Sequence, residues 1–207
     1  MKKTTFGTDM KPIFALLPTD EVIQKIYQIR GELIKKGWGA ESERTQVLPH
    51  LSVSYLVETN DDALIENIKE DLASTFTELV PVTLDVVRTR TWSNKVSLMF
   101  DNKPVRELVS ELEALLSKYG LSDSQNYLNQ LNKSEAELGE KTCTSFEEAL
   151  GDHIKIARNI KDEHLNEAAA YISEFLPKKF TFNKLVFIDS GCTEKDILLQ
   201  LTSGLNA

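Results

Sequence analysis

Strand-like and helix-like runs follow one another along this chain, and their order is what most limits the folds open to it. Apolar and polar residues that alternate over about four to eight positions predict a strand, whereas apolar residues three and four apart predict a helix. The order here is strand, helix, strand, helix, hairpin, helix, strand, helix and a closing pair of strands. This order favours an α+β fold with mainly antiparallel sheets.

Turn and cap residues mark the ends of these runs. The first helix follows Pro18 and ends at Gly37, and the third begins at Asn102 with Pro104. Each half of the chain holds a strand that opens on histidine and an amphipathic helix after it. We therefore expect a bilobal molecule in which two antiparallel sheets face a central cleft and the helices pack on the outside. The predicted strands cover residues 13–17, 49–55, 80–90, 95–100, 152–157, 180–189 and 196–202.

The size and charge of the chain exclude one large class of ligand. Its 207 residues, 41% of them hydrophobic, are enough for one compact domain with a good core. A net charge of -8 would repel a long nucleic acid, which needs a basic surface to replace its counterions. A few local cations would still suffice for a small phosphorylated ligand, so we expect a small nucleotide or a short RNA end as the partner.

The cysteines and the first apolar run indicate where such a protein works. Cys143 and Cys192 form no CxxC pair, so the sequence predicts neither a disulfide framework nor a zinc site, and a reducing cytoplasm fits best. The apolar run 12–18 is too short for a signal peptide or a membrane span. We expect a cytoplasmic monomer that does not contact a membrane.

Two stretches place histidine at the head of an alternating strand: PHLSVSY at 49–55 and HIKIA at 153–157. Because side chains alternate across a strand, His50, Ser52 and Ser54 are predicted to share one face, with Tyr55 on the other. His153 and Lys155 share a face in the same way. Each strand thus offers an imidazole and, two residues on, a donor that can bind an anion.

This pairing suits the hydrolysis of a phosphodiester. One group must take a proton from the attacking water, and another must give a proton to the leaving oxygen. Histidine, with an unperturbed pKa of about 6.5, can do either near neutral pH, and no metal or other cofactor is needed. A lone histidine is more often a surface or core residue, and His164, in a polar helix start, is interpreted that way.

The two stretches together resemble the paired motifs, histidine, apolar, Ser or Thr, apolar, of the two-histidine (2H) phosphoesterases. This superfamily includes bacterial RNA 2',5'-ligase-like proteins and cyclic nucleotide phosphodiesterases. KPIFALLPTDE at 11–21 resembles the family's opening strand and turn, and FTFNKLVFIDSG at 180–191 its late strand. The resemblance covers nearly the whole chain and implies a single 2H domain over 1–207, with an insertion at 121–150.

The resemblance also implies roles for residues. His50 and His153 match the catalytic histidines, and Ser52 matches the first phosphate-binding hydroxyl. Lys155 stands where the second Ser or Thr belongs, and it offers a charged phosphate contact instead. The implied activity is hydrolysis of a 2',3'-cyclic or 2',5'-linked nucleotide.

Other interpretations stay open at this point. One is a non-catalytic module that holds a nucleotide or a phosphorylated partner through Lys155, with 121–150 as the partner surface. RNA end-joining fits a chain this acidic poorly. Arg88 and Arg90 alternate on a strand that would border the cleft, and Tyr55 and Trp92 are candidates for stacking on a base. Each of these four has an equally simple interpretation as a solvated or packed strand residue.

Overall fold

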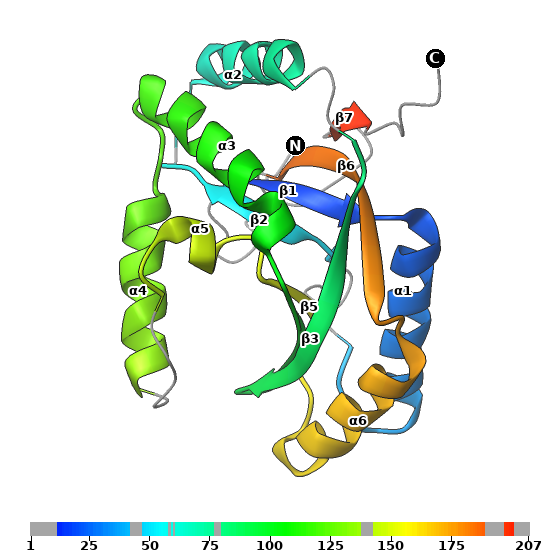
Figure 1. Cartoon of the computed structure of the whole chain (residues 1–207). Helices are drawn as coiled ribbons and strands as arrows, with labels where there is room; N and C mark the ends of the chain where they lie inside the picture. Colours follow the sequence, from blue (N-terminus) through cyan, green and yellow to red (C-terminus); the bar gives the residue numbers. More distant parts are fainter. Residues whose placement is uncertain are drawn as a thin grey trace, which may run out of the picture.

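Strands and helices both build the molecule, which confirms the predicted α+β class (Figure 1). The structure is a computed structural model, and it describes residues 12–41, 47–57, 59, 61–76, 80–137, 143–188 and 197–200. The strands are β1 (Ile13–Pro18), β2 (Leu51–Tyr55), β3 (Val82–Trp92), β4 (Lys95–Phe100), β5 (His153–Ala157), β6 (Lys179–Ile188) and β7 (Ile197–Gln200). The helices are α1 (Asp20–Lys35), α2 (Asp62–Thr75), α3 (Arg106–Lys118), α4 (Ser124–Glu137), α5 (Phe146–Ala149) and α6 (Leu165–Phe175), with short 3-10 turns η2 (Lys103–Val105) and η3 (Asp162–His164).

The strands form one path of hydrogen-bonded neighbours, in the order β2-β1-β6-β3-β4-β5, and β7 pairs with β6. Each of these pairs is antiparallel. Residues 82–85 of β3 pair with β6, whereas residues 86–92 pair with β4. The expectation of two separate sheets in two lobes is therefore not confirmed, because β3 belongs to both groups of strands.

The two ends of this path come close together. The N–H of Gly151, two residues before β5, donates a hydrogen bond of 2.8 Å to the carbonyl of Ser52 in β2. Gly151 has a φ of 69°, and a Cβ at this position would lie 2.7 Å from Cγ2 of Val105. Glycine is needed here both for the left-handed backbone and for the close approach. The contact brings the two histidine strands to the same place.

Apolar side chains fill both faces of the central strands. All six residues of β1 are buried, as its unbroken apolar sequence IFALLP predicts. Phe14 and Leu16 belong to the larger core, and Ile13 and Leu17 to a smaller one on the other face. In Figure 1, α1 and α6 lie on one side of β3 and β6, and α3, α4 and α5 lie on the other.

Several boundaries differ from the sequence-based predictions. Trp92, expected in the hairpin turn, is the last residue of β3, and the turn is made by Ser93 and Asn94. The stretch 121–150, for which the sequence predicts no regular element, contains α4 and α5. Parts of the two closing strands and Cys192 lie outside the described residues. Among the helices that the structure describes, none is both long enough and apolar enough to cross a membrane.

Candidate active site

The four residues predicted from the two motifs line one cleft. His153 is the first residue of β5, and His50 immediately precedes β2. The cleft is lined by Arg30, Val47, Leu48, His50, Ser52, His153, Lys155 and Arg158. The described part of the chain holds no group of three His, Cys, Asp or Glu side chains that could bind a metal ion.

His50 is held as a neutral imidazole with a defined tautomer. Its Nδ1 lies 2.8 Å from the carbonyl oxygen of Leu48. A carbonyl can only accept, so Nδ1 carries the proton and Nε2 carries the lone pair. The pKa of His50 is lowered to about 4, mainly by burial and in part by the charges of Lys155 and Arg158, against a raising effect of the Leu48 hydrogen bond.

His153 has a different partner. Its Nδ1 lies 2.7 Å from Oδ1 of Asp152, and about a fifth of each side chain is exposed. A carboxylate on Nδ1 fixes the orientation of the ring. The two histidines thus differ in the partner of Nδ1, which is a carbonyl for His50 and a carboxylate for His153.

A β-bulge follows each histidine at the same distance. In β2, Ser52 pairs with Ala15 and Ser54 pairs with Phe14, so Val53 is the extra residue. In β5, Lys155 pairs with Ser97 and Ala157 with Val96, so Ile156 is the extra residue. Bulges of this kind change the direction of a strand and re-aim its side chains.

The bulge in β2 overturns one prediction about the faces of the strand. Tyr55, expected opposite to Ser52, instead hydrogen-bonds with Ser52 and with Tyr127 of α4. The rings of Tyr55 and Tyr127 stack with their centroids 4.0 Å apart. Ser54, expected beside His50, is fully buried and accepts the N–H of Phe14 through its hydroxyl. The extra residue has shifted the alternation by one position.

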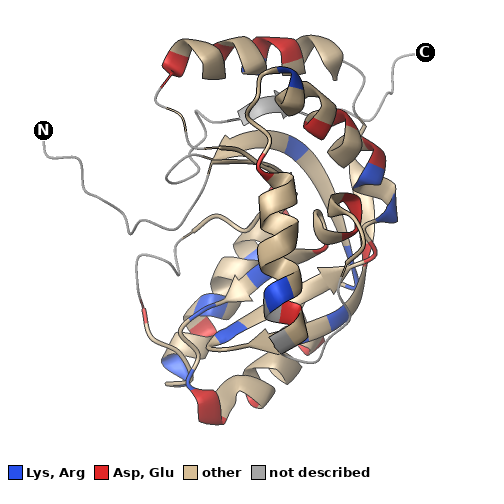
Figure 2. Cartoon of the chain, turned by 90° about the vertical axis from the view of Figure 1, so that its left-hand side faces the viewer, with Lys and Arg blue, Asp and Glu red and all other residues tan. Residues whose placement is uncertain are grey.

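Positive charge gathers in the cleft although the chain is acidic. Lys155 is largely buried, and burial together with the charges of Arg158 and Lys95 lowers its pKa to about 8. Arg30 also stays charged, although burial lowers its pKa to about 10. Figure 2 shows acidic residues along α2 at the top of the view, whereas several lysines and arginines lie together in its lower half. The cleft therefore suits a small anion.

The side chain of Arg30 in α1 connects the two segments that carry the histidines. Its Nε donates to the carbonyl of Ile156 at 2.6 Å and its Nη2 to that of Lys155 at 3.2 Å. Its Nη1 donates to the carbonyl of Val47 at 2.7 Å, three residues before His50. One guanidinium thus bonds to the main chain within three residues of each histidine.

Arg88 and Arg90 lie on the cleft side of the sheet but not in the cleft. Arg88 pairs with Met99 and Met99 with His153, and Arg90 reaches Lys155 in the same way through Ser97. Residues directly opposite in antiparallel strands share a face, and two strand spacings put both arginines roughly 10 Å from β5. They are neighbours of the cleft and do not line it.

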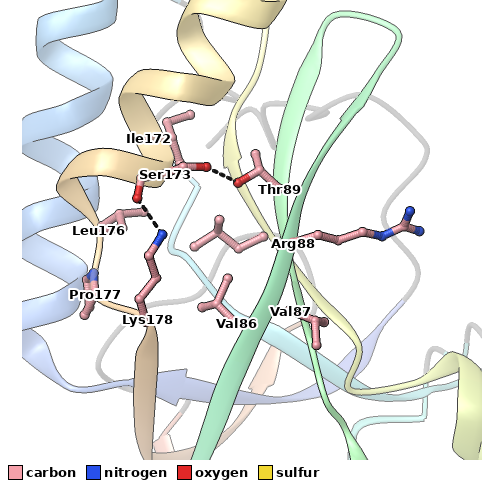
Figure 3. A pocket seen from close by; sticks show the side chains of 10 residues that line it. Val86, Val87, Arg88, Thr89, Ile172, Ser173, Leu176, Pro177 and Lys178 are labelled. Atoms are coloured by element: carbon pink, nitrogen blue, oxygen red, sulfur yellow. Dashed lines mark hydrogen bonds between the residues drawn. The ribbon is translucent and has the colours of Figure 1, made fainter.

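The surroundings of these arginines differ. Arg90 forms a buried, two-pronged ion pair with Glu135 of α4, at 2.8 and 3.0 Å. Arg88 points away from α6 (Figure 3). The figure shows a second pocket, larger than the histidine cleft, whose lining includes Thr89 and Ser173, which hydrogen-bond to each other. Trp92 stands at the end of β3, 37% exposed, with the cations of Arg90 and Lys95 near its ring.

Three residues at the cleft escape the motif-based prediction, and two of them carry a sequence signal. Arg30 occupies the apolar stripe of α1, where Ile23, Ile26 and Leu33 are buried, so a charge there indicates a special role. Asp152 directly precedes the second histidine. Arg158 carries no such signal, because its place depends on how the strand leaves the bulge. The third histidine, His164, stacks on Trp38 away from the cleft, as expected.

Comparisons with known proteins support the fold. No protein-family model and no curated protein matches the sequence. Among solved structures, one described as a phosphoesterase aligns with a TM-score of 0.54 at 13% identity. E. coli LigT aligns with a TM-score of 0.52 at 15% identity in complex with 3'-AMP, and of 0.51 at 12% identity in its apo form. Each alignment covers 93% of this chain and 98% of the other.

These identities are low, but the coverage is nearly complete on both sides. The likeness spans nearly the whole chain, and the resemblance predicted from the sequence is confirmed at the level of the fold. The chain has the fold of these phosphoesterases.

Proposed function

We propose that this protein is a metal-independent phosphoesterase of the two-histidine superfamily, acting on a 2',3'-cyclic or 2',5'-linked nucleotide. The observation that carries the proposal is the pair of differently held imidazoles in one cationic cleft. His50 bonds to a carbonyl through Nδ1, and His153 bonds to a carboxylate through Nδ1. Both rings keep Nε2 for a ligand.

The two environments assign the two proton transfers. Neutral His50 takes a proton from a water molecule through Nε2 as the water oxygen forms a bond to phosphorus. Protonated His153 gives its Nε2 proton to the ribose oxygen as the bond between that oxygen and phosphorus breaks. The Lys155 ammonium and the Ser52 hydroxyl hold the non-bridging oxygens, whose charge grows in the transition state.

The expected substrate is small. The cations that face the cleft are few, and the rest of the chain is acidic, so a nucleotide or a short RNA end fits better than a long strand. The 3'-AMP named for the complex of LigT belongs to the same size class. Arg88, Arg90 and Trp92 lie beyond the cleft on the same side of the sheet, where they would contact a base or a second phosphate. We further propose that residues 121–150 are an insertion in the family's domain and that the enzyme works as a cytoplasmic monomer.

The proposal is tested with purified protein in excess chelator on a mixed panel of 2',3'-cyclic nucleotides and 2',5'-linked oligonucleotides. Mass spectrometry of the products is expected to show hydrolysis that disappears in His50→Ala. Binding of a panel member without any product would contradict catalysis and favour a module that only holds a nucleotide.

Lys155 separates these two outcomes further. Lys155→Thr restores the hydroxyl that the family's second motif carries. Loss of turnover makes the lysine part of a working site, because its charge would be needed at the phosphate. Turnover gained by this variant over an inactive parent would mean that the natural chain is a binding module.

A further inference from the structure

Arg30 is a charged residue in a place where the helix pattern calls for an apolar one. It is 9% exposed, on the face of α1 that also carries Ile26 and Leu33. A buried charge costs several kcal/mol unless hydrogen bonds and partners compensate it, so such a residue is expected to have a specific task.

The contacts of Arg30 define that task. Its three nitrogens donate to three main-chain carbonyls, of Val47, Lys155 and Ile156. The first precedes Leu48, whose own carbonyl holds Nδ1 of His50. The other two belong to the bulge residue Ile156 and to Lys155 directly before it, three and two residues after His153. Arg30 therefore reaches the peptide groups that set the position of each imidazole.

The bulge explains why a guanidinium is suited to this position. The extra residue interrupts the ladder between β4 and β5, and two successive carbonyls at the bulge turn to a side chain instead. A planar fork with five N–H groups can bond to several carbonyls in fixed directions, whereas an ammonium acts as a compact point charge. Lysine would keep the charge of Arg30 but not this geometry.

We propose that Arg30 is a positioning residue that holds the two catalytic histidines at their working separation, by bonding to the main chain of both strands. This inference rests on the function proposed above, since it gives Arg30 its effect through His50 and His153. Its carbonyl bonds fix the segment that leads into β2 relative to β5. An error of about 1 Å in such a separation typically costs about a hundredfold in rate.

The test compares Arg30→Lys and Arg30→Met with Ile29→Ala as the matched control. Ile29 is the neighbouring residue of α1 and is buried in the core, so its truncation loosens the same helix without touching the three carbonyls. For each variant we would measure melting temperature, kcat, KM and the imidazole pKa values by NMR titration without substrate.

For both Arg30 variants we expect kcat to fall about 10- to 100-fold while KM changes less than about threefold. The pKa of His50 is expected to rise from about 4 toward 6.5, because the segment 47–50 loosens and admits water. Arg30→Lys should lose kcat to the same extent as Arg30→Met. If loss of the charge prevents Arg30→Met from folding, Arg30→Lys keeps the charge and can still be measured. Ile29→Ala should lower the melting temperature and leave kcat and both titrations unchanged.

Two results would overturn the inference. One is a wild-type kcat and an unchanged His50 titration in the folded Arg30 variants. The other is the same shift of the His50 pKa in Ile29→Ala, since Arg30 would then act only through general stability. If the wild-type protein turns over no panel substrate, the proposed function fails. The titrations alone would then decide whether Arg30 positions the imidazoles.

Discussion

The two histidine strands are built alike and yet treat their histidines differently. In both, the residue three positions after the histidine is a bulge, Val53 in β2 and Ile156 in β5. In both, Nδ1 is hydrogen-bonded and the histidine lines the cleft. The partner of Nδ1 differs, however: it is an uncharged carbonyl for His50 and the negatively charged Asp152 carboxylate for His153.

This difference teaches that a sequence motif places an imidazole without deciding its charge. The burial of His50 opposes its protonation, and so do the nearby cations of Lys155 and Arg158. His153 has an acidic neighbour in direct contact. In the proposed mechanism, a base and an acid therefore arise from two copies of nearly the same strand.

Removing either histidine should have the largest effect. His50→Ala and His153→Ala are each expected to lose at least about a hundredfold in kcat, because positioned acid or base catalysis contributes about 10² to 10⁴. His164→Gln is the matched control and should keep full turnover, since His164 stacks on Trp38 outside the cleft. Steady-state assays on the best panel substrate measure this. Near wild-type rates in both alanine variants would exclude the assignment.

Asp152→Asn should sharpen the contrast between the two half-sites. It removes a charge-assisted hydrogen bond to His153, worth about 2 kcal/mol, so we expect a fall of about thirtyfold in kcat. The NMR titration of His50 should hardly move, because Asp152 is not among the groups that shift its pKa. A clear shift of the His50 titration would mean that Asp152 acts on the cleft as a whole.

Ser52→Ala should cost less, about tenfold. The change removes one hydrogen bond to the phosphate, worth about 1 to 1.5 kcal/mol, and leaves both proton carriers in place. Tyr127→Phe tests the hydrogen bonds around Ser52. It removes the α4 hydroxyl that hydrogen-bonds with Tyr55, which in turn hydrogen-bonds with Ser52. A loss in Ser52→Ala as large as that of the histidine variants would give Ser52 a further role.

The smallest expected effect concerns pH. With a pKa of about 4, His50 protonates only under acidic conditions, so the acid limb of kcat/KM is expected near pH 4 and not near 6.5. Lys155→Met removes one of the charges that oppose protonation, and should raise the His50 pKa by a fraction of a unit. Lys103→Met, at an exposed site in η2, is the control. An acid limb near pH 6.5 in the wild type would contradict the buried neutral base.

Much of this arrangement was readable in the sequence because it is local. Period-two runs predicted the strands, and Asp61, whose side chain accepts the N–H of Leu64, is a local cap at the start of α2. The histidine spacing predicted His50 and His153 at one cleft, together with Ser52 and Lys155.

What escaped prediction depends on pairing between distant segments. A bulge exists only relative to a partner strand, so the shift that turns Tyr55 toward Ser52 cannot be seen in PHLSVSY alone. The sharing of β3 by two groups of strands likewise depends on where β6 begins, because Lys179 is its first residue and pairs with Asp85. The apolar pattern of α4 is too weak to predict a helix. This helix is held by polar contacts, such as the ion pair between Arg90 and Glu135.

The place of β6 in the sheet has a consequence for how the chain folds. It lies between β1 and β3, yet it is made after almost all other elements, and Ile13 in β1 pairs with Ile188. Contacts so far apart in sequence slow folding. During synthesis the facing edges of β1 and β3 must wait unpaired until residue 188 has left the ribosome, and unpaired apolar edges invite aggregation. Chains that end before Lys179 are therefore expected to be poorly recovered, although both histidines are already present.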